Sequence, residues 1–224
     1  MKSDLSNWSA RILYLFLATD LVFFGLHFIH AYSGVAGNPS FSLETDGGYA
    51  EIFQYLKEYW IALILGFLAL RKHSATYLGW SLLFFYLLLD DSLQLHENLG
   101  YRLSRKLNFL PSFNLRAEDF GELLVSGFVG LFFLIFIATA YRYSDRLSRE
   151  ISRSLIKMFF ALAVFGIVVD MMHVAINSPT LEPIHILLED GGELIVMSVI
   201  ASFVFFLSER IHPAPLSNYL DARQ

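Results

Sequence analysis

Acidic side chains and histidines recur within the apolar stretches of this 224-residue chain. Three acids lie inside such stretches and three others open one: Asp20, Asp91, Asp170, Glu51, Glu122 and Glu193. A charged group inside a lipid bilayer is costly and by default marks a functional site. In a water-poor interior, carboxylates and imidazoles must be paired, protonated or bound to a metal ion. The pattern therefore predicts a buried site that holds protons or metal.

Helical periodicity brings these groups onto shared faces. At about 100° per residue, Asp170 and His173 fall on one side of a helix, and Glu189 and Glu193 stack one turn apart. Because lipid cannot solvate charge, such faces turn toward the interior of a bundle. We therefore predict one shared metal site, with ligands drawn from Asp20, His27, Glu51, Asp91, His96, Glu97, Glu118, Glu122, Asp170, His173, Glu189 and Glu193.

The composition of this set indicates which ion it suits. Lys57 is the one Lys or Arg well inside a predicted helix, so few cations are available to neutralise the acids. Carboxylates and imidazoles suit iron, zinc or manganese, and we expect a divalent metal, with iron favoured, in a two-metal site. The absence of cysteine excludes thiolate ligands. Asp170-x2-His173 resembles in spacing the Glu-x2-His element of di-iron helix bundles, an analogy of spacing rather than of family.

Membrane-spanning helices are the elements that position these residues. The chain is 55% hydrophobic and 17% charged, with a mean hydropathy of +0.52, whereas soluble domains carry about 25% charged residues. Several apolar runs reach the roughly 20 residues that a bilayer core requires. We predict an all-α integral membrane bundle in a single domain, 1–224, with six spans at 11–31, 49–70, 75–98, 119–141, 153–176 and 191–208.

An internal repeat organises the predicted spans. The glutamates that open the even-numbered spans recur at intervals of 71 residues: Glu51, Glu122 and Glu193. The aspartates inside the odd-numbered spans each have a polar partner seven residues later: His27, Asn98 and Asn177. These marks predict three tandem two-helix repeats, about 11–70, 75–141 and 153–208, related by approximate threefold pseudosymmetry.

The placement of Lys and Arg predicts the orientation. Eleven of them gather at the N-terminus, in the 71–74 turn, in the 141–157 stretch and in the tail. The other side has four, Arg102, Arg105, Lys106 and Arg116, all in the 99–118 loop, and the 32–48 and 177–190 loops have none. Positive residues favour the cytoplasmic side, so both termini should be cytoplasmic, in a membrane of the bacterial inner type. The metal site then lies in the outer half of the bundle. No basic tract suggests nucleic acid, and the expected surroundings are the lipid bilayer.

The function that this site suggests is a membrane metalloenzyme. Such a metal would act in redox or oxygen-dependent chemistry on an apolar substrate, such as a lipid-like or quinone-like molecule. A zinc hydrolase is the alternative within the enzymes. Outside the enzymes, transporters of divalent cations or protons also use repeats and midplane carboxylates. A third alternative is a non-catalytic subunit whose acids pair with basic residues of a partner in a membrane complex.

Overall fold

The chain folds into a bundle of long helices. The computed structural model describes residues 2–33, 37–176 and 181–211, which form helices and turns with no strand among them. The elements in chain order are α1 (Lys2–Ser33), the 3-10 turn η1 (Pro39–Phe41), α2 (Tyr49–Lys72), α3 (Ala75–Leu93), α4 (Leu95–Leu107), α5 (Ala117–Arg142), α6 (Arg146–Ala163), the π-helix η2 (Val164–Val169), α7 (Asp170–Ile176) and α8 (Glu182–Ile211). The all-helical prediction is confirmed.

Five helical segments among the described residues are long and apolar enough to cross a membrane. They are Ala10–Ser33, Tyr49–Lys72, Ala117–Arg142, Arg146–Ile176 and Glu182–Glu209. The predicted span 75–98 corresponds to α3, which is only 19 residues long and is not among the five. Asp90 and Asp91 occupy its last turn and lower its hydropathy.

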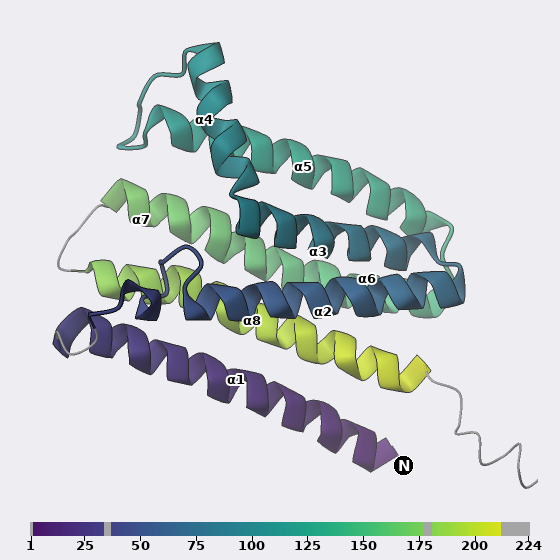
Figure 1. The fold of residues 1–224 in the computed structure, drawn as a ribbon. Helices are drawn as coiled ribbons and strands as arrows, with labels where there is room; N and C mark the ends of the chain where they lie inside the picture. Colours follow the sequence, from purple (N-terminus) through teal and green to yellow (C-terminus); the bar gives the residue numbers. More distant parts are fainter. Residues whose placement is uncertain (1, 34–36, 177–180, 212–224) are drawn as a thin grey trace, which may run out of the picture.

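The long helices run side by side, with α2 and α8 the most enclosed (Figure 1). α8 packs along α1 and α2, and α2 packs between α3 and α8. α1 contacts α2 much less than α8, so the predicted first hairpin is not a packing unit of its own. Asn177, the third partner in the predicted repeat, lies outside the described residues. The threefold repeat is therefore not confirmed, although α2, α5 and α8 all begin at the same end of the bundle (Figure 1).

Two predicted helix boundaries are wrong for local reasons. The predicted 75–98 helix breaks at Gln94, which has a left-handed backbone (φ 51°). The Asp90 carboxylate bridges this break, because it accepts a hydrogen bond at 2.8 Å from the backbone N–H of His96 in the first turn of α4. The last helix begins at Glu182 rather than at 191. Pro183, just inside its start, is well suited to the first turn of a helix, where no N–H bond is lost.

The bundle has two halves of different character. We call the half where α2, α5 and α8 begin the acidic half, and the half that contains the α2–α3 and α5–α6 turns the apolar half. A large cluster of buried apolar side chains fills the apolar half, with Trp80, Phe84, Leu65 and Leu155 almost fully enclosed. The acidic half holds the candidate site.

Candidate acidic site

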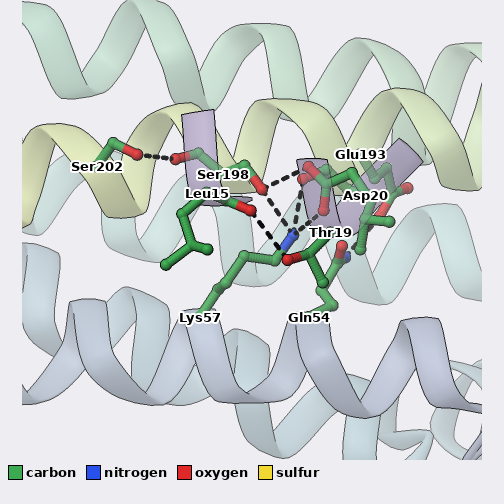
Figure 2. Close-up of polar contacts among 9 residues, drawn as sticks. Leu15, Thr19, Asp20, Gln54, Lys57, Glu193, Ser198 and Ser202 are labelled. Carbon is green, nitrogen blue, oxygen red and sulfur yellow. Dashed lines mark hydrogen bonds and ion pairs between the residues drawn. The ribbon is translucent and has the colours of Figure 1, made fainter. Parts of the chain in front are cut away.

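A buried lysine joins three helices at the middle of the bundle (Figure 2). Lys57 of α2 donates to the carbonyl of Leu194 at 2.8 Å and to Ser198 Oγ at 3.1 Å, both on α8. It lies 3.4 Å from Asp20 of α1, and Ser198 donates to the other Asp20 oxygen at 2.7 Å. Lys57 and Asp20 are 0% and 1% exposed. The predicted ligand Asp20 is therefore already neutralised by a cation and a hydroxyl.

Glu193 lies next to this network, facing the π-helix. Its carboxylate accepts a hydrogen bond from Gln54 Nε2 at 3.2 Å (Figure 2), and it interacts electrostatically with Asp91 and Asp190. A side chain at Gly166 of η2 would collide with the Glu193 carboxylate. π-helical turns widen the helix locally and are frequent at functional sites. Here the turn and its glycine make the room that Glu193 occupies.

A pair of carboxyl groups joins α2 to α3. Glu58, which is 1% exposed, interacts electrostatically with Asp91 through its carboxyl group. Its Oε2 atom is buried and has no hydrogen-bond partner among the described residues. Two carboxyl groups in such contact cannot both carry a full negative charge, so they require a shared proton or a nearby cation.

The second carboxyl pair lies between α7 and α8 and includes histidine. The Asp170 and Glu189 carboxyl groups interact electrostatically, and His173 Nδ1 lies 2.6 Å from Glu189 Oε2. The rings of His173 and His185 lie 5.3 Å apart between centroids. His185 Nδ1 is buried and has no hydrogen-bond partner among the described residues. Two carboxylates and two imidazoles thus gather at one place, as carboxylate–imidazole metal sites require.

Two further acids of the acidic half, Asp90 and Asp119, contact basic side chains. Asp90 lies 3.1 Å from His96, and this hydrogen bond raises the pKa of His96 to about 9. Asp119 is buried and accepts from the guanidinium of Arg116 at 2.7 and 2.9 Å. The hydrogen bond to Asp119 also raises the pKa of Arg116.

The remaining predicted ligands lie apart from these pairs. His27 is 2% exposed, and its Nε2 donates to the carbonyl of Pro183 at 3.2 Å while its Nδ1 accepts from the N–H of Leu43 at 3.4 Å. This imidazole therefore joins α1 to the first turn of α8 and to the segment between η1 and α2, with one nitrogen each. Glu51 accepts from the backbone N–H of Gly47 at the start of α2. Glu97 is exposed.

Two predicted ligands of α5 occupy its first turns at the α4 contact. Glu122 packs against Gly100 of α4, where an added side chain would meet the Glu122 backbone. Glu118 lies in the first turn of α5 and is partly exposed. Among the described residues, neither Glu118 nor Glu122 forms a hydrogen bond with either carboxyl pair.

Of the predicted ligands, the structure thus brings Asp170, His173 and Glu189 into contact and places Asp91 and Glu193 near each other. Sequence reasoning missed Glu58, Gln54, Ser198 and His185 as members. Gln54, Lys57 and Glu58 follow the one-turn spacing that marks a shared helix face, which was a usable signal. In the described part of the chain, no three His, Asp or Glu side chains have the geometry of a ready-made metal site.

The comparisons with known proteins place the chain in a family. Residues 11–208 match the family model described as "Domain of unknown function (DUF8692)". The chain belongs to this family. The matched range runs from the first apolar stretch through the last, so it contains the whole acidic site. No curated protein and no solved structure matches the chain.

Proposed function

We propose that this chain is an integral membrane metalloprotein that binds a divalent ion in its acidic half. The observation that carries the proposal is the gathering of Asp170, His173, Glu189 and His185 between α7 and α8. Without an ion, the two carboxyl groups of this set are held together by a shared proton. A metal ion would replace that proton and draw both imidazoles inward by side-chain rotation.

Charge balance supports an ion at this place. The two carboxyl pairs, Asp170 with Glu189 and Glu58 with Asp91, have no Lys or Arg in hydrogen-bond contact among the described residues. Lys57 is directed to Asp20 instead. A bound cation neutralises several carboxylates at once, whereas protons do so one by one and only where burial favours the neutral acid. A second ion would use Glu58, Asp91 and Glu193.

The ligand chemistry narrows the ion and the reaction class. Carboxylate and imidazole ligands suit iron, manganese or zinc, and iron would make the protein a redox or oxygen-dependent enzyme. Zinc would make it a hydrolase. The substrate is proposed to be an apolar, lipid-like or quinone-like molecule, because the exposed surface of the long helices is apolar, as with Phe128, Phe160 and Ile135, and only such a molecule reaches the bundle through lipid.

The proposed topology has six spans, with α3 as the short one, in three hairpins with both termini cytoplasmic. The Lys and Arg residues of the α2–α3 turn and of the α5–α6 connection support this orientation. The acidic half then faces the outside.

Elemental analysis of the purified chain tests the proposal. The wild-type protein should carry about one to two ions per chain, and His173→Ala and Glu189→Gln should each lower that content at least several-fold. Glu150→Gln is the matched control, since Glu150 pairs with Arg146 on the surface of the opposite half. Metal-free wild-type protein that is fully folded would refute the proposal.

Proton exchange is the second candidate function. The support for it is the electrostatic coupling within the two carboxyl pairs, since such pairs titrate together and can share a proton. A proton transporter additionally needs a polar path through the apolar half, and the buried core there is built of side chains such as Leu65, Leu68, Met197 and Ile200. This core would have to open during transport.

A partner-bound subunit is the outcome that remains if neither metal nor proton uptake is measured.

A further inference from the structure

One segment of the acidic half lies outside the bundle of long helices. α4 runs across the direction of the long helices at the end where α5 begins (Figure 1). Its buried residues, Gly100 and Ser104, face α5. The segment that follows leads through residues 108–116 into the first turn of α5. If the long helices cross the bilayer, α4 lies along the membrane surface.

The face of α4 that points away from α5 is basic. Arg102, Arg105 and Lys106 are exposed and fall within about 100° of one another, opposite Gly100 and Ser104. Arg105 donates to the Tyr101 hydroxyl at 2.7 Å and its guanidinium lies 5.5 Å from the Tyr101 ring centroid. These three residues are the only Lys and Arg of α4, so one face of the helix carries all of its positive charge.

The tight turn at residues 112–115, which follows α4 in the chain, and the segment just before it expose large apolar side chains. Phe113 and Leu110 are 86% and 80% exposed. Phe113 and Asn114 occupy the two central positions of the turn with left-handed backbones, φ 54° and 61°, and Ser112 and Leu115 exchange two backbone hydrogen bonds at 3.2 and 2.9 Å. A bulky side chain is disfavoured in this conformation. The turn nevertheless presents a phenylalanine at its tip.

The turn lies level with the ends of the membrane-spanning segments. Asn114 donates to the carbonyl of Ala175, one residue before the end of α7, at 3.3 Å, and α5 begins at Ala117. In segments that lie on a membrane surface, Phe and Leu side chains enter the boundary between the headgroups and the acyl chains. Basic residues near that level attract anionic headgroups, each contributing about 1 kcal/mol.

We propose that residues 95–116 form a membrane-surface anchor that binds anionic phospholipid, with Arg102, Arg105 and Lys106 contacting the headgroup phosphates and Phe113 and Leu110 inserted among the acyl chains. The inference needs the membrane-spanning fold but not the metal site. It gives a role to the exposed basic face of α4 and to the exposed apolar side chains of the turn, which packing in the bundle does not explain. The occupant is lipid because the surface combines positive charge with exposed apolar side chains at one level.

The natural absence of cysteine makes the test direct. The full chain carrying Phe113→Cys is labelled with an environment-sensitive fluorophore and reconstituted in vesicles of phosphatidylcholine with phosphatidylglycerol. We expect strong quenching by lipid-borne nitroxide and weak quenching by aqueous iodide. Phe128→Cys on the exposed apolar face of α5 and Glu44→Cys in the 37–48 loop supply the lipid and water references, since both positions are exposed.

The charge requirement is tested in the same assay. The Arg102→Gln/Arg105→Gln/Lys106→Gln variant should lose most of the lipid quenching at position 113 and lower the preference for phosphatidylglycerol about five-fold per residue removed. The Phe113→Cys chain with all three basic residues intact should behave like this variant in pure phosphatidylcholine. Iodide quenching at position 113 equal to that at position 44 would overturn the anchor. Quenching by lipid that is unchanged in the triple variant would overturn the anionic partner.

Discussion

The two halves of the bundle bury their side chains in different ways. In the apolar half, Phe84, Leu65 and Leu155 are enclosed by other apolar side chains, and their burial stabilises the fold without a specific partner. In the acidic half, Lys57, Asp20 and Glu58 are equally enclosed. Buried charge is tolerated only with a matching partner. Mutations should therefore act through lost packing in one half and through uncompensated charge in the other.

Breaking the central ion pair should have the largest effect on stability. Lys57→Met leaves the Asp20 carboxylate buried, with Ser198 as its remaining hydrogen-bond partner among the described residues. Removing one member of a buried pair costs about 3–5 kcal/mol. Chemical unfolding in detergent micelles measures the loss. Adding Asp20→Asn to this variant should recover part of it, and a loss under about 1 kcal/mol for Lys57→Met alone would mean that water reaches Asp20.

Truncation in the apolar half should destabilise the fold without affecting the site. Leu65 is 0% exposed in the centre of the apolar cluster. Leu65→Ala should cost about 2–4 kcal/mol through the cavity that it leaves. The metal content of the folded fraction should equal that of the wild type. A variant that loses metal in proportion to stability would show that the two halves are not independent.

Filling the space at the π-helix should disturb the site more than the fold. Gly166→Ala forces a methyl group against the Glu193 carboxylate and should cost about 1–3 kcal/mol through this overpacking. It should also lower the metal content, because Glu193 is displaced. Gly127→Ala on α5 is the matched control, since nothing lies within 4 Å of the added Cβ. Gly127→Ala should be neutral or slightly stabilising.

The His96–Asp90 pair should give the smallest effect, and one that depends on pH. Its hydrogen bond raises the pKa of His96 from 6.5 to about 9. Since the folded pKa is raised, the stabilisation is fully present below about pH 6.5 and disappears as the pH rises through 9. The unfolding free energies of the wild type and His96→Gln should differ at pH 6 and converge above pH 9. A difference that is constant over this range would show that the pair is not ionic.

The sequence predicted the helices well because apolar runs of spanning length are a strong local signal. It misplaced the start of α8 because Asp190-Gly191-Gly192 has the composition of a helix start. In the folded chain these residues stay helical, with the Phe165 ring lying where a side chain of residue 192 would be. That contact joins residues far apart in the sequence, and periodicity carries no information about it.

The candidate site was predictable in composition but not in pairing. Spacing placed Asp170 with His173 and Glu189 with Glu193. It could not show that Glu189 contacts Asp170 while Glu193 turns to Gln54, because that choice depends on how α8 lies against η2 and α7. The spacing also could not show that His96 contacts Asp90, which follows from the break in the helix at Gln94. The backbone conformation of one residue decided that partner.

The central claim is that a divalent cation binds in the acidic half. Titration of the metal-stripped chain tests this claim most directly. Ferrous, manganous or zinc ion is added to the full chain in detergent micelles while heat, released protons and melting temperature are followed. The account predicts saturation at about one to two ions per chain, with proton release from the carboxyl pairs and a higher melting temperature. No binding, no proton release and an unchanged melting temperature after chelation would contradict it and leave proton sharing as the explanation of the paired acids.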